Sequence, residues 1–303
     1  MPPSPLAYVA PDDAPFLTRW MLLSPFARIA LFVVGWLASA YIGYHVAAAL
    51  GLIGKGGTPT DQANAVVFGE LLPVLAAYLG VVCLVERRKP SELTRHAATG
   101  VLGGLGMGVV FFSAVVGVLA IAGSYHVTGT NAHPAWAYEF VVFGLCAGVA
   151  EEIMFRGVLF RMCEEGMGTW FAIVASALAF GAVHLGNNAA TWVDALDIAL
   201  LAGVPLALLY HLTRSLWPCV GWHAGWNLAQ GTLYGIPVSG NAASGLLVSK
   251  LTGPDWLTGG AFGVEGSVVA PIVCSLGTIA LLSIAIRRGT IVAPFWRRQR
   301  AGL

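Results

Sequence analysis

Long apolar runs, separated by short polar stretches, occupy most of the 303 residues. A helix needs roughly 20 predominantly apolar residues to cross a bilayer. The runs near this length predict spanning helices at about 27–50, 65–85, 101–123, 138–162, 169–186, 194–211, 216–236 and 267–286. The pattern therefore predicts an all-α membrane protein with about eight transmembrane helices in a single bundle.

Basic residues concentrate in alternate loops between these runs. They are Arg19, Arg28, Arg87, Arg88, Lys89, Arg95, Arg161, Arg214, Arg287, Arg288, Arg297, Arg298 and Arg300. The other loops carry only Lys55 and Lys250. Because Lys and Arg accumulate on the cytoplasmic side, both termini should be cytoplasmic. We expect an N-terminal cytoplasmic tail at 1–26, a membrane domain at 27–286 and a basic cytoplasmic tail at 287–303.

Composition supports the membrane assignment. Hydrophobic residues make up 57% of the chain and charged residues only 10%, whereas a soluble domain carries about 25% charged residues. The net charge of +1, without a basic face, argues against a nucleic-acid partner and leaves membrane lipid as the surroundings. The Ala-, Gly- and Arg-rich composition suggests a bacterium, so we expect the protein in an inner membrane.

Three of the apolar runs contain side chains that are expensive to place in hydrocarbon. These side chains are Glu151, Glu152, Arg156, His184, His223 and Asn227. Glu152 and Arg156 are four residues apart, so they share a helix face in the order that favours an ion pair. Glu151 points to a different sector. This division predicts a structural Glu152–Arg156 pair and a Glu151 carboxylate that faces a cavity.

His223 and Asn227 also share one helix face, as two groups that serve a single centre would. Two imidazoles, a carboxylate and an amide oxygen can bind a divalent metal ion or position a water molecule. No HExxH sequence is present, so the chain is not a zincin. If the three helices converge, these groups form one site.

The motifs resemble those of a known family. Glu-Glu-x-x-x-Arg occurs at Glu151, Phe-x-x-x-His ends at His184, and His-x-x-x-Asn begins at His223, all within about 136–232. In this order they are similar to the CPBP intramembrane proteases, also called the CAAX protease or Abi family, which includes the prenyl-protein endopeptidase Rce1.

The resemblance implies glutamate-dependent peptide hydrolysis in a cavity that opens toward the cytoplasm. Glu151 would be the general base, with Glu152 and Arg156 fixing its orientation. His184, His223 and Asn227, with or without Glu151 as a ligand, would hold a divalent metal ion, expected to be zinc, or stabilise the oxyanion. The substrate would be a membrane-associated protein or peptide. The physiological substrate, the cleavage site and the oligomeric state stay open.

Two other functions stay open as well. In a proton-coupled transporter, Glu151 and the histidines would form a proton relay, although the chain shows no repeated halves. In a non-catalytic scaffold or immunity protein of similar fold, the polar side chains would only join helices.

Three expectations concern the rest of the bundle. Gly100, Gly104 and Gly108, at four-residue spacing, should allow close helix packing. The weakly hydrophobic segment 237–266 should form an outer loop. Glu164 and its acidic neighbour should be solvated at the cytoplasmic end of their helix.

Overall fold

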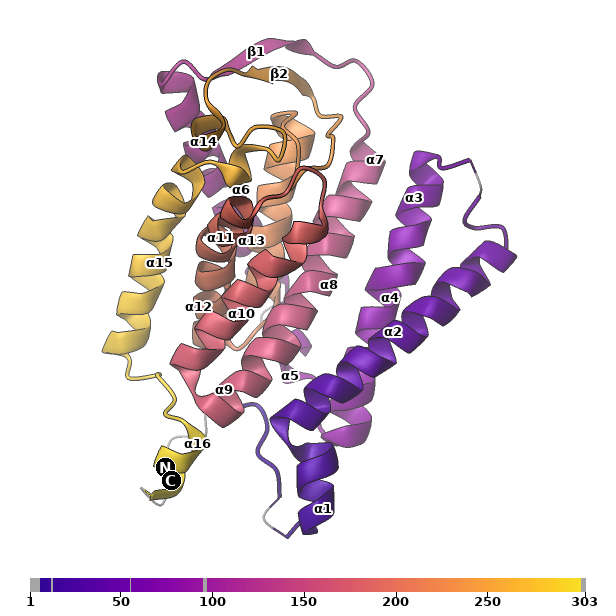
Figure 1. Cartoon of the computed structure of the whole chain (residues 1–303), viewed down its shortest axis with the longest axis vertical. Coiled ribbons are helices and arrows are strands. Elements are labelled where there is room, and N and C mark those ends of the chain that lie inside the picture. The colour runs from indigo at the N-terminus through magenta and orange to yellow at the C-terminus, as the bar shows by residue number, and fades with distance from the viewer. Residues whose placement is uncertain (1–5, 12, 55, 95–96, 301–303) are drawn as a thin grey trace.

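The computed structural model describes residues 6–11, 13–54, 56–94 and 97–300 (Figure 1). Most of these residues are helical. Six helices are long and apolar enough to cross a membrane: Pro25–Ala49, Pro59–Val85, Ala97–Ile121, Thr169–Gly186, Trp192–Thr213 and Val269–Arg287. They account for six of the predicted spans, so the membrane assignment is confirmed at this level.

Several long helices contain short stretches of 3-10 or π geometry, labelled η. The first half of the chain comprises α1 (Phe16–Thr18), η1 (Arg19–Leu23), α2 (Pro25–Ala49), α3 (Pro59–Val66), η2 (Val67–Leu71), α4 (Leu72–Leu79), η3 (Gly80–Val85), α5 (Ser91–Thr94), α6 (Ala97–Ile121), β1 (Tyr125–Thr130), α7 (Trp136–Glu139), η4 (Phe140–Ala147), α8 (Gly148–Glu152), η5 (Ile153–Phe160) and α9 (Arg161–Met167). The second half comprises α10 (Thr169–Val183), η6 (His184–Gly186), α11 (Trp192–Ile198), η7 (Ala199–Gly203), α12 (Val204–Thr213), α13 (Trp217–Asn227), η8 (Leu228–Leu233), β2 (Leu247–Leu251), α14 (Asp255–Thr258), η9 (Val264–Gly266), α15 (Val269–Arg287) and α16 (Phe295–Arg300).

The two remaining predicted spans are also helical. The run α7–α9 covers residues 136–167 without a break, and α13 continues through η8 to Leu233. The first carries Glu151, Glu152 and Arg156 in its middle, and the second is shorter than the six apolar helices. Charged residues within the first and the short length of the second thus set them apart from the six apolar helices. Eight crossings stay a prediction.

A two-stranded antiparallel ribbon joins the otherwise helical fold. β1 pairs with β2 at the end of the bundle opposite the two termini (Figure 1). The sequence analysis did not predict these strands. Both termini lie at the same end, as an even number of crossings requires. Lys55 and Arg95, which entered the topology prediction, lie outside the described residues, and the cytoplasmic placement of the termini stays a prediction.

Helices α6 and α13 pack at backbone distance. A methyl group on Gly104 would overlap the Pro218 carbonyl oxygen, and one on Gly108 would overlap the Trp222 carbonyl oxygen. From the other side, Gly225 meets the backbone of Leu105. The predicted role of the glycine spacing in close packing is confirmed. This contact holds α13, with its His and Asn, rigidly against the bundle.

A buried charge cluster fastens the N-terminal helices at the end that holds the termini. The guanidinium of Arg28 on α2 donates to Glu86 Oε1 at 2.5 Å, and that of Arg161 on α9 donates to the same oxygen at 2.8 Å. Burial opposes ionisation, but Arg161, Arg28 and Arg88 together hold the pKa of Glu86 below its usual range. Toward the opposite end, α2 and α3 diverge from the remaining helices (Figure 1).

The expected solvation of Glu164 was wrong. Its side chain is fully buried and accepts hydrogen bonds from His211 Nδ1 at 2.7 Å and from Thr169 Oγ1 at 2.8 Å, and it also pairs with Arg214. The end of α12 covers this carboxylate. Its His211, with the adjacent Arg214, provides the hydrogen bonds that water would otherwise make. The neighbouring Glu165 is largely buried and pairs with Arg28.

We predict that Gly104→Ala lowers the thermal unfolding midpoint of the purified protein. Overpacking a tight contact costs typically about 1–3 kcal/mol, and here the obstacle is backbone, which cannot rotate away. Gly103→Ala is the matched control, because a methyl group on Gly103 meets nothing within 4 Å. Circular dichroism in detergent measures both midpoints. Equal midpoints for the two variants would contradict the packing argument.

Candidate active site

Four of the six polar residues that the sequence singled out line one cavity of about 200 Å³. Glu151 enters from α8, His184 from the end of α10, and His223 and Asn227 from α13. Their predicted convergence is confirmed. Phe180 lies among them, with its ring centroid 5.0 Å from that of His184 and 5.9 Å from that of His223. This aromatic ring therefore packs against both imidazoles of the cavity.

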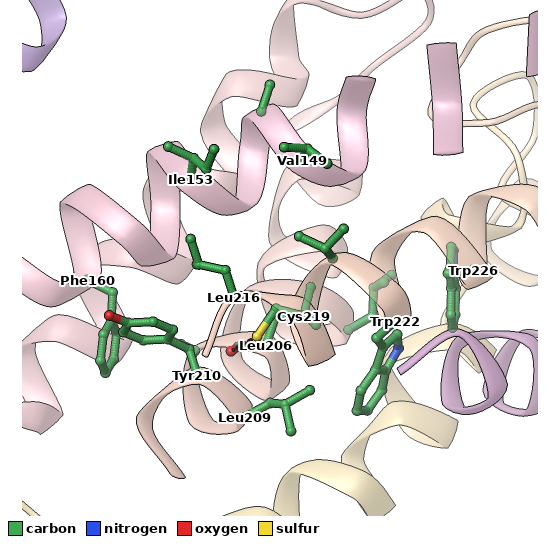
Figure 2. Close-up of a cluster of buried hydrophobic side chains, with 14 of the residues drawn as sticks. Val149, Ile153, Phe160, Leu206, Leu209, Tyr210, Leu216, Cys219, Trp222 and Trp226 are labelled. Carbon is green, nitrogen blue, oxygen red and sulfur yellow. Dashed lines mark hydrogen bonds between the residues drawn. The ribbon is translucent and has the colours of Figure 1, made fainter. Parts of the chain in front are cut away.

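A hydrophobic core fixes the helices that carry these residues. In Figure 2, Val149 and Ile153 point from the α8–η5 helix toward Leu216 and Cys219 near the start of α13. All four side chains are buried. Since cores of this kind are close-packed, the helix with the two glutamates has little freedom to shift against α13.

Glu152 and Arg156 form the predicted ion pair, and neither side chain is exposed. Arg156 Nη1 donates to Glu152 Oε1 at 2.8 Å, while its Nη2 donates to the carbonyls of Ala202 and Gly203 at 3.2 Å. The guanidinium also lies 4.4 Å from the centre of the Phe180 ring. A buried charge of this kind is tolerated because it is paired and hydrogen-bonded.

The pair has a second function that the sequence did not reveal. Glu152 Oε1 also contacts His223 Nδ1 at 3.0 Å. With Glu152 ionised, Nδ1 of His223 carries the proton and donates, which leaves Nε2 as the nitrogen available to the cavity. The ion pair therefore orients an imidazole that lies 71 residues further along the chain.

Glu151 and His184 face each other. Glu151 Oε2 lies 4.0 Å from His184 Nε2, and that oxygen is buried without a hydrogen-bond partner among the described residues. His184 Nδ1 donates to the Phe180 carbonyl at 2.7 Å, so its Nε2 is the nitrogen turned to the site. A gap of 4.0 Å is too long for a direct hydrogen bond, and one water molecule fits it with bonds of about 2.8 Å.

Asn227 completes the cavity. Its Nδ2 donates to the Phe143 carbonyl at 3.1 Å, which fixes the orientation of the amide. An amide nitrogen carries two hydrogens, so the second stays available to a ligand. The site thus offers a carboxylate, two imidazole Nε2 atoms and one amide N–H.

The four predicted metal ligands line the same cavity, but they are not gathered into a metal-binding cluster. Within the described part of the chain, no three His, Cys, Asp or Glu side chains are close enough to hold a metal ion together. Glu152 contacts only Nδ1 of His223, so Nε2 of that imidazole stays available as a ligand. The predicted metal ion stays a prediction, and no step of the mechanism below depends on it.

The sequence analysis missed two groups of cavity residues. Glu70, on η2, lines the cavity with Glu151. The sequence did contain a signal for Glu70, because a carboxylate inside a predicted membrane span is itself unusual. Ser239 and Glu265 close the cavity from the outer segment, with Glu265 accepting from Trp226 Nε1 at 3.0 Å and from Ser239 N at 2.8 Å. The predicted outer loop at 237–266 thus folds back onto the site.

Comparisons with known proteins agree with the motifs. Residues 132–229 match the model of a family described as Type II CAAX prenyl endopeptidase Rce1-like, so the resemblance is confirmed over this segment. The UPF0177 protein YaiH of Lactococcus lactis subsp. lactis (strain IL1403) is 25% identical over 217 residues, which cover 68% of this chain and 86% of that protein. No solved structure matches the chain.

The matched segment contains all six predicted site residues. The family match points to CAAX-type intramembrane protease activity, and the six apolar helices indicate an integral multi-pass membrane protein. The comparisons do not assign roles to individual side chains.

We predict that Arg156→Met destabilises the fold more than the double variant Glu152→Gln/Arg156→Met. Removing one partner of a buried pair typically costs about 3–5 kcal/mol, because the other charge is left unpaired, whereas neutralising both avoids that penalty. Thermal unfolding midpoints of the wild type, both single variants and the double variant give the comparison. Equal losses in Arg156→Met and the double variant would show that Glu152 does not depend on Arg156 for its charge.

Proposed function

We propose that the chain is an intramembrane endopeptidase that hydrolyses a peptide bond of a membrane-associated protein or peptide. The observation that carries the proposal is the Glu151–His184 pair, two groups 4.0 Å apart across a cavity within an apolar bundle. A carboxylate without a hydrogen-bond partner is a poor structural element in such surroundings. It is well suited to hold and deprotonate a water molecule.

In the first step, a water molecule between Glu151 Oε2 and His184 Nε2 attacks the scissile carbonyl carbon. Glu151 takes one proton from the water as the C–O bond forms. The C–N bond then breaks, and the proton passes from Glu151 to the leaving nitrogen. The products are a carboxylic acid and an amine, and the enzyme returns to its starting state.

Asn227 and His223 act on the carbonyl oxygen. The free N–H of Asn227 donates to the oxygen as negative charge develops there, and prior orientation by the Phe143 carbonyl reduces the reorganisation needed. His223, held by Glu152 through Nδ1, donates to the same oxygen from Nε2 when the imidazole carries its second proton. Glu152 and Arg156 thus act through His223 rather than on the substrate.

Orientation and location form part of the proposal. With both termini in the cytoplasm of a bacterial cell, the ribbon β1–β2 and the segment 237–266 lie on the outer side of the inner membrane. The proton-coupled transporter and the non-catalytic scaffold or immunity protein are the alternatives that the next experiment excludes or supports.

We predict that Glu151→Gln lowers peptide hydrolysis by about 10²–10⁴-fold, because loss of a general base typically has this effect, and that His184→Ala lowers it by a similar factor. The assay exposes detergent-solubilised protein to a proteome-derived peptide mixture and counts new termini by mass spectrometry. Glu139→Gln is the matched control. Glu139 lies in the same helical run, outside the cavity, and accepts from Ser244 N, which a glutamine oxygen can still do. If the wild type cleaves nothing, a scaffold or transporter becomes the better assignment.

The divalent metal ion has its own test. The sequence prediction, with Glu151, His184, His223 and Asn227 as ligands, expects about one zinc ion per chain, lost in both His184→Ala and His223→Ala. Elemental mass spectrometry of gently purified protein measures it. A metal-free wild type that still cleaves peptides would contradict the metal prediction. Glu151 and His184 would then bind and activate the water molecule without a metal ion.

A further inference from the structure

A second space, an apolar groove of about 520 Å³, adjoins the catalytic cavity. It lies between α2 on one side and the α8–η5 helix and the end of α10 on the other. Nine apolar side chains line it: Ile29, Phe32, Val33, Trp36, Met154, Phe155, Val158, Leu159 and Val183. Such a groove suits an apolar segment of a substrate.

Among the described residues, four line both the groove and the cavity: Glu70, Glu151, His184 and Asn187. Within that part of the chain they are also the only polar residues that line the groove. We call these four residues the junction. A substrate that lies in the groove and reaches the catalytic pair must pass the junction.

Glu70 is a junction residue to which neither an ion pair nor the proposed mechanism gives a role. It lies in the apolar helix Pro59–Val85, where a carboxylate is costly. The buried glutamates nearby have partners, such as Arg156 for Glu152 and Ser244 N for Glu139, whereas Glu70 is partly buried. Glu70 makes no hydrogen bond or ion pair with any residue in the described part of the chain.

Two of the four junction residues are carboxylates, and His184 is the other ionisable one. Glu70 is close enough to Glu151 for the two carboxylates to interact electrostatically. No Lys or Arg among the described residues lines either the cavity or the groove. The nearby Arg156 donates to Glu152 and to backbone carbonyls instead. Acidic groups between low-dielectric walls attract a cation.

We infer that Glu70 is a specificity-determining residue that binds a cationic group of the substrate, a Lys or Arg side chain next to an apolar segment. The apolar segment occupies the groove, and the basic side chain pairs with Glu70 at the junction, beside the Glu151–His184 pair. The inference names the substrate class and so rests on the proposed function, but binding tests it without cleavage. A charge-assisted pair in such surroundings also selects against an acidic group at the same position.

Peptide binding provides the first test. The probes are fluorescent apolar decapeptides in which lysine occupies each position in turn, each with a counterpart carrying norleucine at that position. Fluorescence anisotropy with the protein in lipid nanodiscs gives the dissociation constants, and partition into the bilayer is the same for every protein variant. We expect at least one lysine peptide to bind wild type tenfold or more tightly than its counterpart.

The variants make the test specific. Glu70→Gln should abolish the preference for lysine, Glu70→Asp should retain part of it, and Glu70→Lys should shift it to glutamate peptides. The control Glu139→Gln should retain the full preference. Equal binding of all lysine and norleucine peptides by the wild type, or an undiminished preference in Glu70→Gln, would overturn the inference.

Thermal stability separates binding from a structural role. If Glu70 serves the substrate, Glu70→Gln removes an unpaired carboxylate from an apolar helix, and the unfolding midpoint stays the same or rises. A clear fall in the midpoint would show that Glu70 supports the fold and would count against the inference. Failure of wild type to cleave any peptide contradicts the proposed hydrolysis, whereas the lysine preference in binding still decides the role of Glu70.

Discussion

The difficulty of keeping charged side chains inside an apolar helix bundle constrains the rest of this structure. Each buried charge needs a partner, and the partners here come from the next turn of the same helix or from other helices. Glu152 pairs with Arg156 one turn away, and the same oxygen orients His223 on α13. The ion pair that stabilises the buried charge of Glu152 thus also fixes the hydrogen bonding of the His223 imidazole, which faces the cavity. Disturbing the pair should change both the stability of the fold and the geometry of the site.

The cavity that Glu151 and His184 line differs from the other charged regions in leaving carboxylates unpaired. At the end of the bundle that holds the termini, Glu86 and Glu164 are surrounded by arginine and histidine donors. At the cavity, Glu151 has only a distant imidazole, and Glu70 has no partner among the described residues. Unpaired acidic groups raise the free energy of the folded state, and they keep their hydrogen-bonding capacity for a water molecule and a substrate.

Much of the fold follows from local pattern. Apolar length identifies the membrane helices, and the four-residue glycine spacing on α6 predicts the close contact with α13, because both depend on periodicity along one helix. The ribbon β1–β2 did not follow from local pattern. Its strands are separated by more than 100 residues and pair only because the bundle brings them to the same end. The burial of Glu164 was missed for the same reason, since its partners belong to α12.

For the site, the sequence by itself singled out Glu151, Glu152, Arg156, His184, His223 and Asn227, because charged and amide groups in hydrocarbon are costly. It also determined the Glu152–Arg156 pair, which depends on helical spacing alone. Only the tertiary structure decided that Glu152 holds His223, that Glu151 faces His184 across 4.0 Å, and that Glu70 and Glu265 line the same cavity. Those relations join residues on different helices, and their distances are set by how the helices pack rather than by position along any one of them.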